Sequence, residues 1–346
     1  MMLSSIINRY HDAYRSKYRV LPGQAKAIRS ILSCRTEGSG ELYVKCPDCN
    51  SQELKPLSCG HRSCPKCQNH ETSRWIDRQI CKLLPVKYFL VTFTLPFELR
   101  SLAYGNQRDI YSIMFSCVSS TLKDFGLNPD NIGADIAMTM ILHTHSRNLS
   151  YHPHLHVVVP GGGVDKMRKQ WKSKKSKFLF NQTALSKVFR ARFLSALSTS
   201  GLYMPKKVPG KWIVNCSYAG KGISALKYLS RYLYRGVISE TNIISDSQGS
   251  VTFRYIESKT GEVKYRTLKG EDFIHLVLQH VLPKGFRRVR DYGFLHGNAK
   301  RLLHLVQLIL HVHIKEIKRS RPVFRCKLCK APMYIIGFST GRFKSG

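Results

Sequence analysis

One segment of this chain, YHPHLHVVV at residues 151–159, restricts the fold more than any other. Side chains two apart in a β-strand point to the same face, so His154 and His156 would lie side by side while Leu155 turns into the core. Two imidazoles at this separation can bind one divalent ion and leave positions open for a substrate oxygen and water. A solvated sheet face would explain one histidine, but not five between residues 143 and 156. The sequence therefore predicts a sheet that carries a metal site.

The segments around this strand predict an α+β fold with a largely antiparallel sheet. Aromatic and β-branched residues predict further strands, and helical spacing of apolar residues predicts the helices. Strands are expected at 88–96, 137–145, 154–162 and 211–216 and in a hairpin across 259–261, and helices within 1–33 and near 70–83, 107–123, 183–198, 222–234, 271–280 and 298–317. Residues 161–177 are predicted to form a loop. Three domains are expected: a helical and zinc-binding region at 1–82, a catalytic domain at 83–318 and a basic tail at 319–346.

The charge of the chain indicates a polyanionic partner. Lys and Arg number 56 against 21 Asp and Glu, which gives a formal charge of +35. Phosphates neutralised by such a surface release counterions, so nucleic acid is the expected partner. The sequence has no apolar run long enough for a membrane span and no recognisable secretory signal. It is therefore expected to act in the cytoplasm, associated with the nucleoid and not with a membrane.

Six of the 11 cysteines fall between Cys34 and Cys67, in a segment too poor in apolar residues to form its own core. Two Cys-x2-Cys pairs separated by 14 residues predict one tetrahedral Zn²⁺ site. The four expected ligands are Cys46, Cys49, Cys64 and Cys67. Three further donors leave the exact ligand set open, or allow a second ion: Cys34, Cys59 and His61. The remaining pair, Cys326 and Cys329, either borrows ligands from elsewhere or is a remnant, and no second structural zinc is predicted from it.

Two tyrosines in a predicted helix form a candidate nucleophile pair. Tyr228 and Tyr232 are four residues apart and would share one helix face. Such pairs more often pack in a core, and a phenol with a pKa of about 10 is a poor nucleophile at neutral pH. A divalent ion and nearby cations would favour the phenolate, and Arg231 and Arg235 supply such cations. The histidine strand in the same chain therefore favours the catalytic interpretation.

Basic residues interleaved with aromatic ones are typical of surfaces that bind single-stranded DNA. One such run, 166–177, includes Lys174 and surrounds Trp171. A second contains Arg287 and Arg288, between Phe286 and Tyr292. Any one of these residues is equally consistent with a solvated loop, so only the runs as a whole indicate contact with DNA.

Several motifs of this chain resemble those of a known family. His154-Leu155-His156 resembles the His-hydrophobic-His signature of the HUH nucleases, and YHPHLHVVVPGGG resembles the insertion-sequence-91 family of rolling-circle transposases. Five further segments are similar to that family in the same order and extend the resemblance over most of the chain: CRT, SC-x4-CPKCQ, LLPVKYFLVTFTLP, YLSRYLYR and HVLPKGFRRVRDYG.

The resemblance implies an antiparallel sheet flanked by helices, with His154 and His156 binding Mg²⁺ or Mn²⁺ at a phosphate of single-stranded DNA. It further implies that Tyr228 and Tyr232 are the nucleophiles, forming a 5′-phosphotyrosine link and freeing a 3′-hydroxyl at transposon ends and target. Because the link conserves the phosphodiester energy, no nucleotide cofactor is expected, and the chain has no Gly-x4-Gly-Lys-Ser/Thr loop. The cysteine region is expected to hold or recognise the DNA end.

Residues 142–150 depart from the family pattern, which tends to have Trp at the position of His145 and Gln near Arg147. The third metal ligand is therefore open, with His143 as the first choice and His152 as the second. Two other functions are weighed against a transposase. A rolling-circle replication initiator or relaxase would share the chemistry but not the cysteine-rich start. A non-enzymatic zinc DNA-binding regulator would leave the histidines and tyrosines without a purpose.

Overall fold

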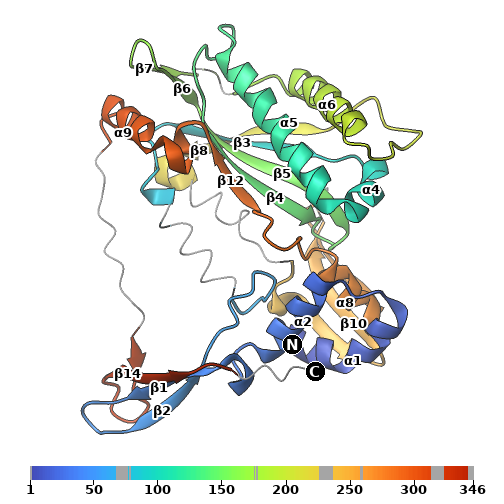
Figure 1. Ribbon diagram of the computed structural model, residues 1–346, viewed down its shortest axis with the longest axis vertical. Coiled ribbons are helices and arrows are strands. Elements are labelled where there is room, and N and C mark those ends of the chain that lie inside the picture. The colour runs from blue at the N-terminus through green and yellow to red at the C-terminus, as the bar shows by residue number, and fades with distance from the viewer. Residues whose placement is uncertain are drawn as a thin grey trace.

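The computed structural model describes residues 2–67, 77, 79–174, 176, 178–225, 237–257, 260–312 and 323–341. Its centre is a five-stranded sheet with the order β12-β4-β5-β3-β8, in which every neighbouring pair is antiparallel (Figure 1). These strands are β3 (Lys87–Thr94), β4 (Met138–His145), β5 (Tyr151–Pro160), β8 (Val214–Lys221) and β12 (Val289–Tyr292). The predicted α+β class with antiparallel sheets and flanking helices is confirmed.

The two faces of this sheet have different surroundings. Helices α5 (Gln107–Leu127) and α6 (Gln182–Thr199), with the short α4 (Arg100–Gly105), contribute to the main core on one face, where Leu155 is fully buried. The opposite face has a smaller apolar cluster that includes Leu90, Val158 and Ala225. Because side chains alternate along β5, His154 and His156 lie on this second face with Val158.

The N-terminal helices pack with a segment from the second half of the chain. Helices α1 (Leu3–Lys17) and α2 (Pro22–Ser33) share a core with α8 (Gly270–Leu278) and with the sheet β11-β10-β9. The strands of that sheet are β9 (Ile243–Ser247), β10 (Ser250–Ile256) and β11 (Val263–Lys269). Asp272 on α8 accepts hydrogen bonds from Lys17 and Tyr18, both at 2.6 Å. Residues far apart in sequence therefore form one packed unit, shown beside the central sheet in Figure 1.

A third unit combines the hairpin that follows α2 with the last two described strands. Its sheet has the order β13-β14-β1-β2 and combines β1 (Glu41–Lys45) and β2 (Gln52–Pro56) with β13 (Phe324–Arg325) and β14 (Pro332–Ser339). β14 pairs with β1 along the whole length of β1. The expected domain boundaries, between 82 and 83 and between 318 and 319, remain predictions.

Residues 161–177, which the sequence predicts to be a loop, instead contain an antiparallel hairpin of β6 (Gly162–Asp165) and β7 (Gln170–Ser173). Helix α9 (Lys300–Ile309) lies within the range 298–317 where a helix is predicted. Most of the helix predicted near 70–83, and the helix predicted near 222–234 beyond residue 225, lie outside the described residues. Among the residues that are described, no helix combines the length and apolar character needed to span a bilayer.

Candidate metal centre and active site

The register of β4 against β5 brings three histidines together. His143 on β4 is the direct cross-strand partner of His154, and His156 lies two residues further along β5. One ring nitrogen from each lies within 4.8 Å of the other two. The ring centroids of His143 and His156 are 4.7 Å apart, and those of His154 and His156 are 4.8 Å apart. This arrangement can hold one metal ion on three imidazoles.

Hydrogen bonds fix which nitrogen of each ring is available. His154 Nδ1 lies 2.7 Å from the carbonyl oxygen of His152, which can only accept, so this nitrogen carries the proton. His156 Nδ1 is 3.0 Å from the hydroxyl of Thr92, its cross-strand neighbour on β3. These contacts leave Nε2 as the ligand atom in both rings, as is usual for metal-binding histidines. Buried Nε2 of His143 has no hydrogen-bond partner among the described residues.

Burial keeps these imidazoles in the neutral form that binds metals. It lowers the pKa of His156 to about 3, with the nearby His154 adding to the effect. Burial also holds the pKa of His154 below its usual value and that of His143 well below it. An unpartnered buried nitrogen is costly in the protein alone, and a bound cation would satisfy it. The three residues therefore fit a divalent ion.

The two other histidines of this region lie outside the group. The β-sheet register shifts between His143 and His145, and the ring of His145 lies 5.3 Å from that of His280. His152 lies within β5, but it does not belong to the group of three histidines whose ring nitrogens lie within 4.8 Å of one another. Of the two candidates for the third ligand, the structure thus brings His143, and not His152, to the pair.

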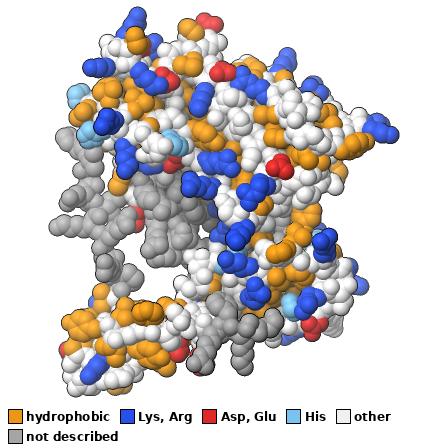
Figure 2. Space-filling model, viewed as in Figure 1, with side chains coloured by type: hydrophobic (Ala, Val, Ile, Leu, Met, Phe, Trp, Pro, Cys, Tyr) orange, Lys and Arg blue, Asp and Glu red, His pale blue; other side chains and the backbone are white. Residues whose placement is uncertain are grey.

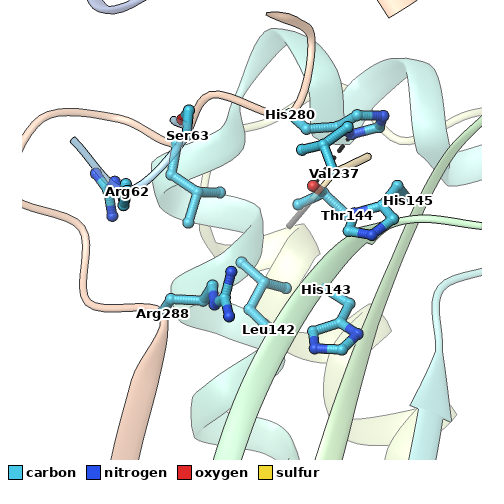
Figure 3. Close-up of a pocket in the computed structure, with 10 residues that line it drawn as sticks. Arg62, Ser63, Leu142, His143, Thr144, His145, Val237, His280 and Arg288 are labelled. Atoms are coloured by element: carbon cyan, nitrogen blue, oxygen red, sulfur yellow. Dashed lines mark hydrogen bonds between the residues drawn. The ribbon is translucent and has the colours of Figure 1, made fainter. Parts of the chain in front are cut away.

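A cavity of about 30 Å³ lies beside His143 (Figure 3). Its lining comes from several parts of the chain: residues 142–145 of β4, Arg62 and Ser63 from the cysteine region, Val237, His280, Leu282 and Arg288. This volume has room for about two water molecules. The cysteine region and the histidine site are therefore neighbours, which the sequence analysis did not anticipate.

Arg62 joins the cysteine region to the segment that precedes β12. Its guanidinium donates to the carbonyl of Phe286 at 2.8 Å and to that of Pro283 at 3.1 Å. Arg62→Ala should lower the free energy of unfolding by roughly 1–3 kcal/mol, because two carbonyls lose their donors. Urea denaturation measures this, with exposed Arg287→Ala as the matched control. An unfolding midpoint equal to that of the control would rule out this role.

The basic residues expected to contact DNA differ in their surroundings. Arg287 is exposed, and Arg288 is half-buried at the cavity. The Lys174 ammonium donates to the carbonyl of Asn131 at 2.9 Å, so it also has a contact within the protein. Arg231 and Arg235 lie outside the described residues. Figure 2 shows many Lys and Arg side chains and few acidic ones on the face in view.

Eight of the 11 cysteines form two groups of four, and the predicted ligand set is divided between these groups. Cys64 and Cys67 lie with Cys34 and Cys59, while Cys46 and Cys49 lie with Cys326 and Cys329. The predicted grouping of Cys46, Cys49, Cys64 and Cys67 around one ion is therefore wrong. The reason is tertiary: the pairing of β14 with β1 brings the last pair to the first, and the end of α2 supplies Cys34.

Sequence comparisons match two parts of the chain to known protein families. Residues 137–302 match a family described as a putative transposase, and residues 6–95 match a transposase zinc-binding domain. The chain is 33% identical over 330 residues to the putative transposase y4qJ of Sinorhizobium fredii, covering 88% of this chain and 82% of the relative. The chain belongs to the insertion-sequence-91 family of transposases. This transposase is also 27% identical over 295 residues to the transposase for insertion sequence element IS801 of Pseudomonas savastanoi pv. phaseolicola, covering 79% of this chain and 70% of the relative.

No solved structure matches this transposase. Within the residues that match the zinc-binding domain, the distances between sulfur atoms indicate whether a zinc ion fits. Cys67 Sγ lies 3.6 Å from Cys34 Sγ and 3.7 Å from Cys59 Sγ. Four sulfur atoms bound to zinc at about 2.3 Å lie about 3.8 Å apart in a tetrahedron. The group of Cys34, Cys59, Cys64 and Cys67 therefore fits a structural zinc ion within the matched residues.

Two polar contacts of this site have no counterpart among the sequence motifs. Thr92 lies on β3, and only the pairing of β3 with β5 shows that its hydroxyl contacts His156. Arg62 lies between Cys59 and Cys64, and only its hydrogen bonds to Pro283 and Phe286 show its contact with the segment before β12. Neither residue has a sequence signal that identifies its role. The nucleophile candidates Tyr228 and Tyr232 lie outside the described residues.

Proposed function

We propose that this transposase cuts and rejoins single-stranded DNA by tyrosine attack beside a metal ion held by His143, His154 and His156. The observation that carries this proposal is the convergence of three neutral imidazoles, each with a ring nitrogen within 4.8 Å of the other two. Three protein ligands leave other coordination positions for phosphate and water oxygens, which suit Mg²⁺ and Mn²⁺. When bound, the ion would stabilise negative charge on the attacked phosphate.

The nucleophiles in this proposal are Tyr228 and Tyr232. Their segment, 226–236, connects two described residues, Ala225 and Val237. Ala225 is fully buried against the sheet face that carries the histidines, and Val237 lines the cavity next to His143. The positions of these two flanking residues support the assignment of the tyrosines.

The proposed reaction exchanges one phosphoester bond for another. The phenol loses its proton, its oxygen bonds to phosphorus, and the bond from phosphorus to the 3′-oxygen breaks. The 3′-oxygen gains a proton and leaves as a hydroxyl, while the 5′-phosphate stays linked to tyrosine. Attack by a 3′-hydroxyl on this link restores a phosphodiester, so no nucleotide cofactor is consumed. A second tyrosine would allow another strand to be cut while the first link persists, as rolling-circle transposition requires.

The basic residues would hold the DNA strand at this centre. Arg288 lines the cavity beside His143, and Arg287 next to it is exposed. Their guanidinium groups can bind phosphate oxygens in a bidentate manner. We assign the same role to Arg231 and Arg235, which flank Tyr232, and to Lys174. Bases of a single strand would remain free to stack on aromatic side chains.

The experiment is an adduct assay with single-stranded DNA that carries the element's end. The full chain with Mn²⁺ should give a covalent protein–DNA species that survives denaturant, and mass spectrometry of its peptides should find the nucleotide on Tyr228 or Tyr232. A chelator should prevent the adduct, and fully duplex DNA should give much less of it. A chain that binds this DNA without any adduct would instead be a non-enzymatic zinc regulator, and modification of another residue would exclude both tyrosines.

A further inference from the structure

One small sheet combines strands from the N-terminal and C-terminal parts of the chain, with a cysteine pair at each of two turns. β1 and β2 form a hairpin whose turn carries Cys46 and Cys49, and β13 and β14 form a second hairpin whose turn carries Cys326 and Cys329. β14 pairs with β1, with Val44 opposite Ile335 and the register continuing to the next residues. The hairpins therefore lie side by side, and both Cys-x2-Cys turns lie at the same end.

The sulfur atoms of the two turns approach each other across the hairpins. Cys46 Sγ lies 3.4 Å from Cys329 Sγ, and Cys49 Sγ lies 3.6 Å from Cys326 Sγ and 3.7 Å from Cys329 Sγ. A disulfide would require about 2.05 Å, whereas thiolates bound tetrahedrally to zinc lie about 3.8 Å apart. The observed separations are close to those of a four-thiolate metal site.

The backbones of the two turns have the same unusual feature. The residue after the second cysteine has a positive φ in each: 58° at Asn50 and 64° at Lys330. Few residues other than glycine adopt this conformation. It turns the chain back into the next strand, and in both turns a backbone hydrogen bond closes the loop, from Cys46 N to Ser51 O and from Cys326 N to Ala331 O. The two Cys-x2-Cys turns thus share a positive φ after the second cysteine and a backbone hydrogen bond that closes the turn.

The sheet has too small an apolar core to hold these strands by itself. Its buried cluster consists of Val44, Met333 and two of the cysteines, Cys46 and Cys326. Most apolar side chains of β14 point into solvent, among them Tyr334, Ile335 and Phe338. Small units with such cores usually depend on a structural metal or disulfides.

We propose that Cys46, Cys49, Cys326 and Cys329 bind a second structural Zn²⁺, which fastens the C-terminal hairpin to the N-terminal one. The four thiols would release their protons to solvent as the ion binds. The family matches end at residues 95 and 302, so neither includes the hairpin at 323–341. This site is independent of the proposed DNA chemistry.

The test counts metal in the purified full chain. Elemental analysis should show that Cys326→Ser with Cys329→Ser holds one zinc per chain fewer than the wild type. Cys34→Ser with Cys67→Ser should also lose one, from the other group. Cys81→Ser, an exposed cysteine outside both groups, is the matched control and should lose none. An unchanged zinc content in the first variant would overturn the proposal.

Cobalt substitution separates thiolate sites from the histidine site. In the cobalt-loaded chain, Cys326→Ser with Cys329→Ser should remove about half of the thiolate-to-cobalt absorption, because four of eight thiolates lose their ion. If this variant does not fold, Cys329→His keeps a metal ligand, so it should retain the zinc content of the wild type and shift the cobalt spectrum. An unshifted spectrum, or two disulfides within this group in the protein purified without reductant, would refute the second zinc site.

Discussion

Replacing both Tyr228 and Tyr232 by Phe should lower the rate of covalent adduct formation by roughly 10³-fold or more. Each replacement removes only the hydroxyl and keeps the ring, so packing around the segment changes little. Either single variant should still form an adduct through the remaining hydroxyl if both tyrosines reach the phosphate. The rates are measured under single-turnover conditions, on denaturing gels, with the oligonucleotide and Mn²⁺ described above.

Tyr218→Phe is the matched control for this variant. Tyr218 is an exposed tyrosine on β8, outside the proposed site, and its loss of a hydroxyl should leave the rate unchanged. DNA affinity of the double variant should stay within a few-fold of the wild type, because the cations remain. An adduct that persists at the wild-type rate in the double variant would contradict tyrosine attack at this segment.

His143→Ala should weaken Mn²⁺ binding and lower the rate of DNA cleavage at fixed Mn²⁺ by about a hundredfold or more. The variant removes one of three ligands and leaves His154 and His156, whose orientations depend on a backbone carbonyl and on Thr92. Raising the Mn²⁺ concentration should recover part of the activity. A titration of the adduct rate against Mn²⁺ measures both effects.

His152→Ala is the control, because His152 lies outside the group of three histidines and the substitution keeps the backbone oxygen that accepts from His154. It should show the Mn²⁺ dependence of the wild type. His143→Leu distinguishes a role as metal ligand from a role in packing. Leucine fills the buried position but cannot bind a metal ion, so this variant should be as inactive as His143→Ala. Full activity in the Leu variant would assign His143 to the core alone.

The helices and strands that are predicted correctly have apolar residues at strongly periodic positions. In α5, Ile110, Met114 and Val118 recur four residues apart and are all buried, while β5 alternates Leu155 and Val157 into the core with histidines on the other face. These patterns depend only on the geometry of a helix or strand, so a sequence displays them directly. For this reason α5, α6, β3, β4 and β5 appear where they were expected, whereas β8 only overlaps the strand expected at 211–216 and β12 was not expected.

The hairpin β6–β7 was not expected, although its two strands are close in sequence. Each strand has only four residues, with glycines and polar side chains that resemble a loop. Gly162 is nevertheless enclosed, since a Cβ there would lie 2.5 Å from the carbonyl oxygen of Lys172 and 2.7 Å from the indole of Trp171. Packing of this kind leaves no periodic signal in so short a segment.

That His154 and His156 share one face follows from the sequence alone, because alternation along a strand is a local property of the backbone. The grouping of cysteines into Cys-x2-Cys pairs is likewise visible in the sequence. The partners of these histidines and cysteines, in contrast, depend on the packing of the whole chain. The register of β4 selected His143 as the third imidazole, and the pairing of β14 with β1 joined Cys326 and Cys329 to the first cysteine pair. Strand register and long-range pairing arise from the burial of whole faces, so no single segment specifies them.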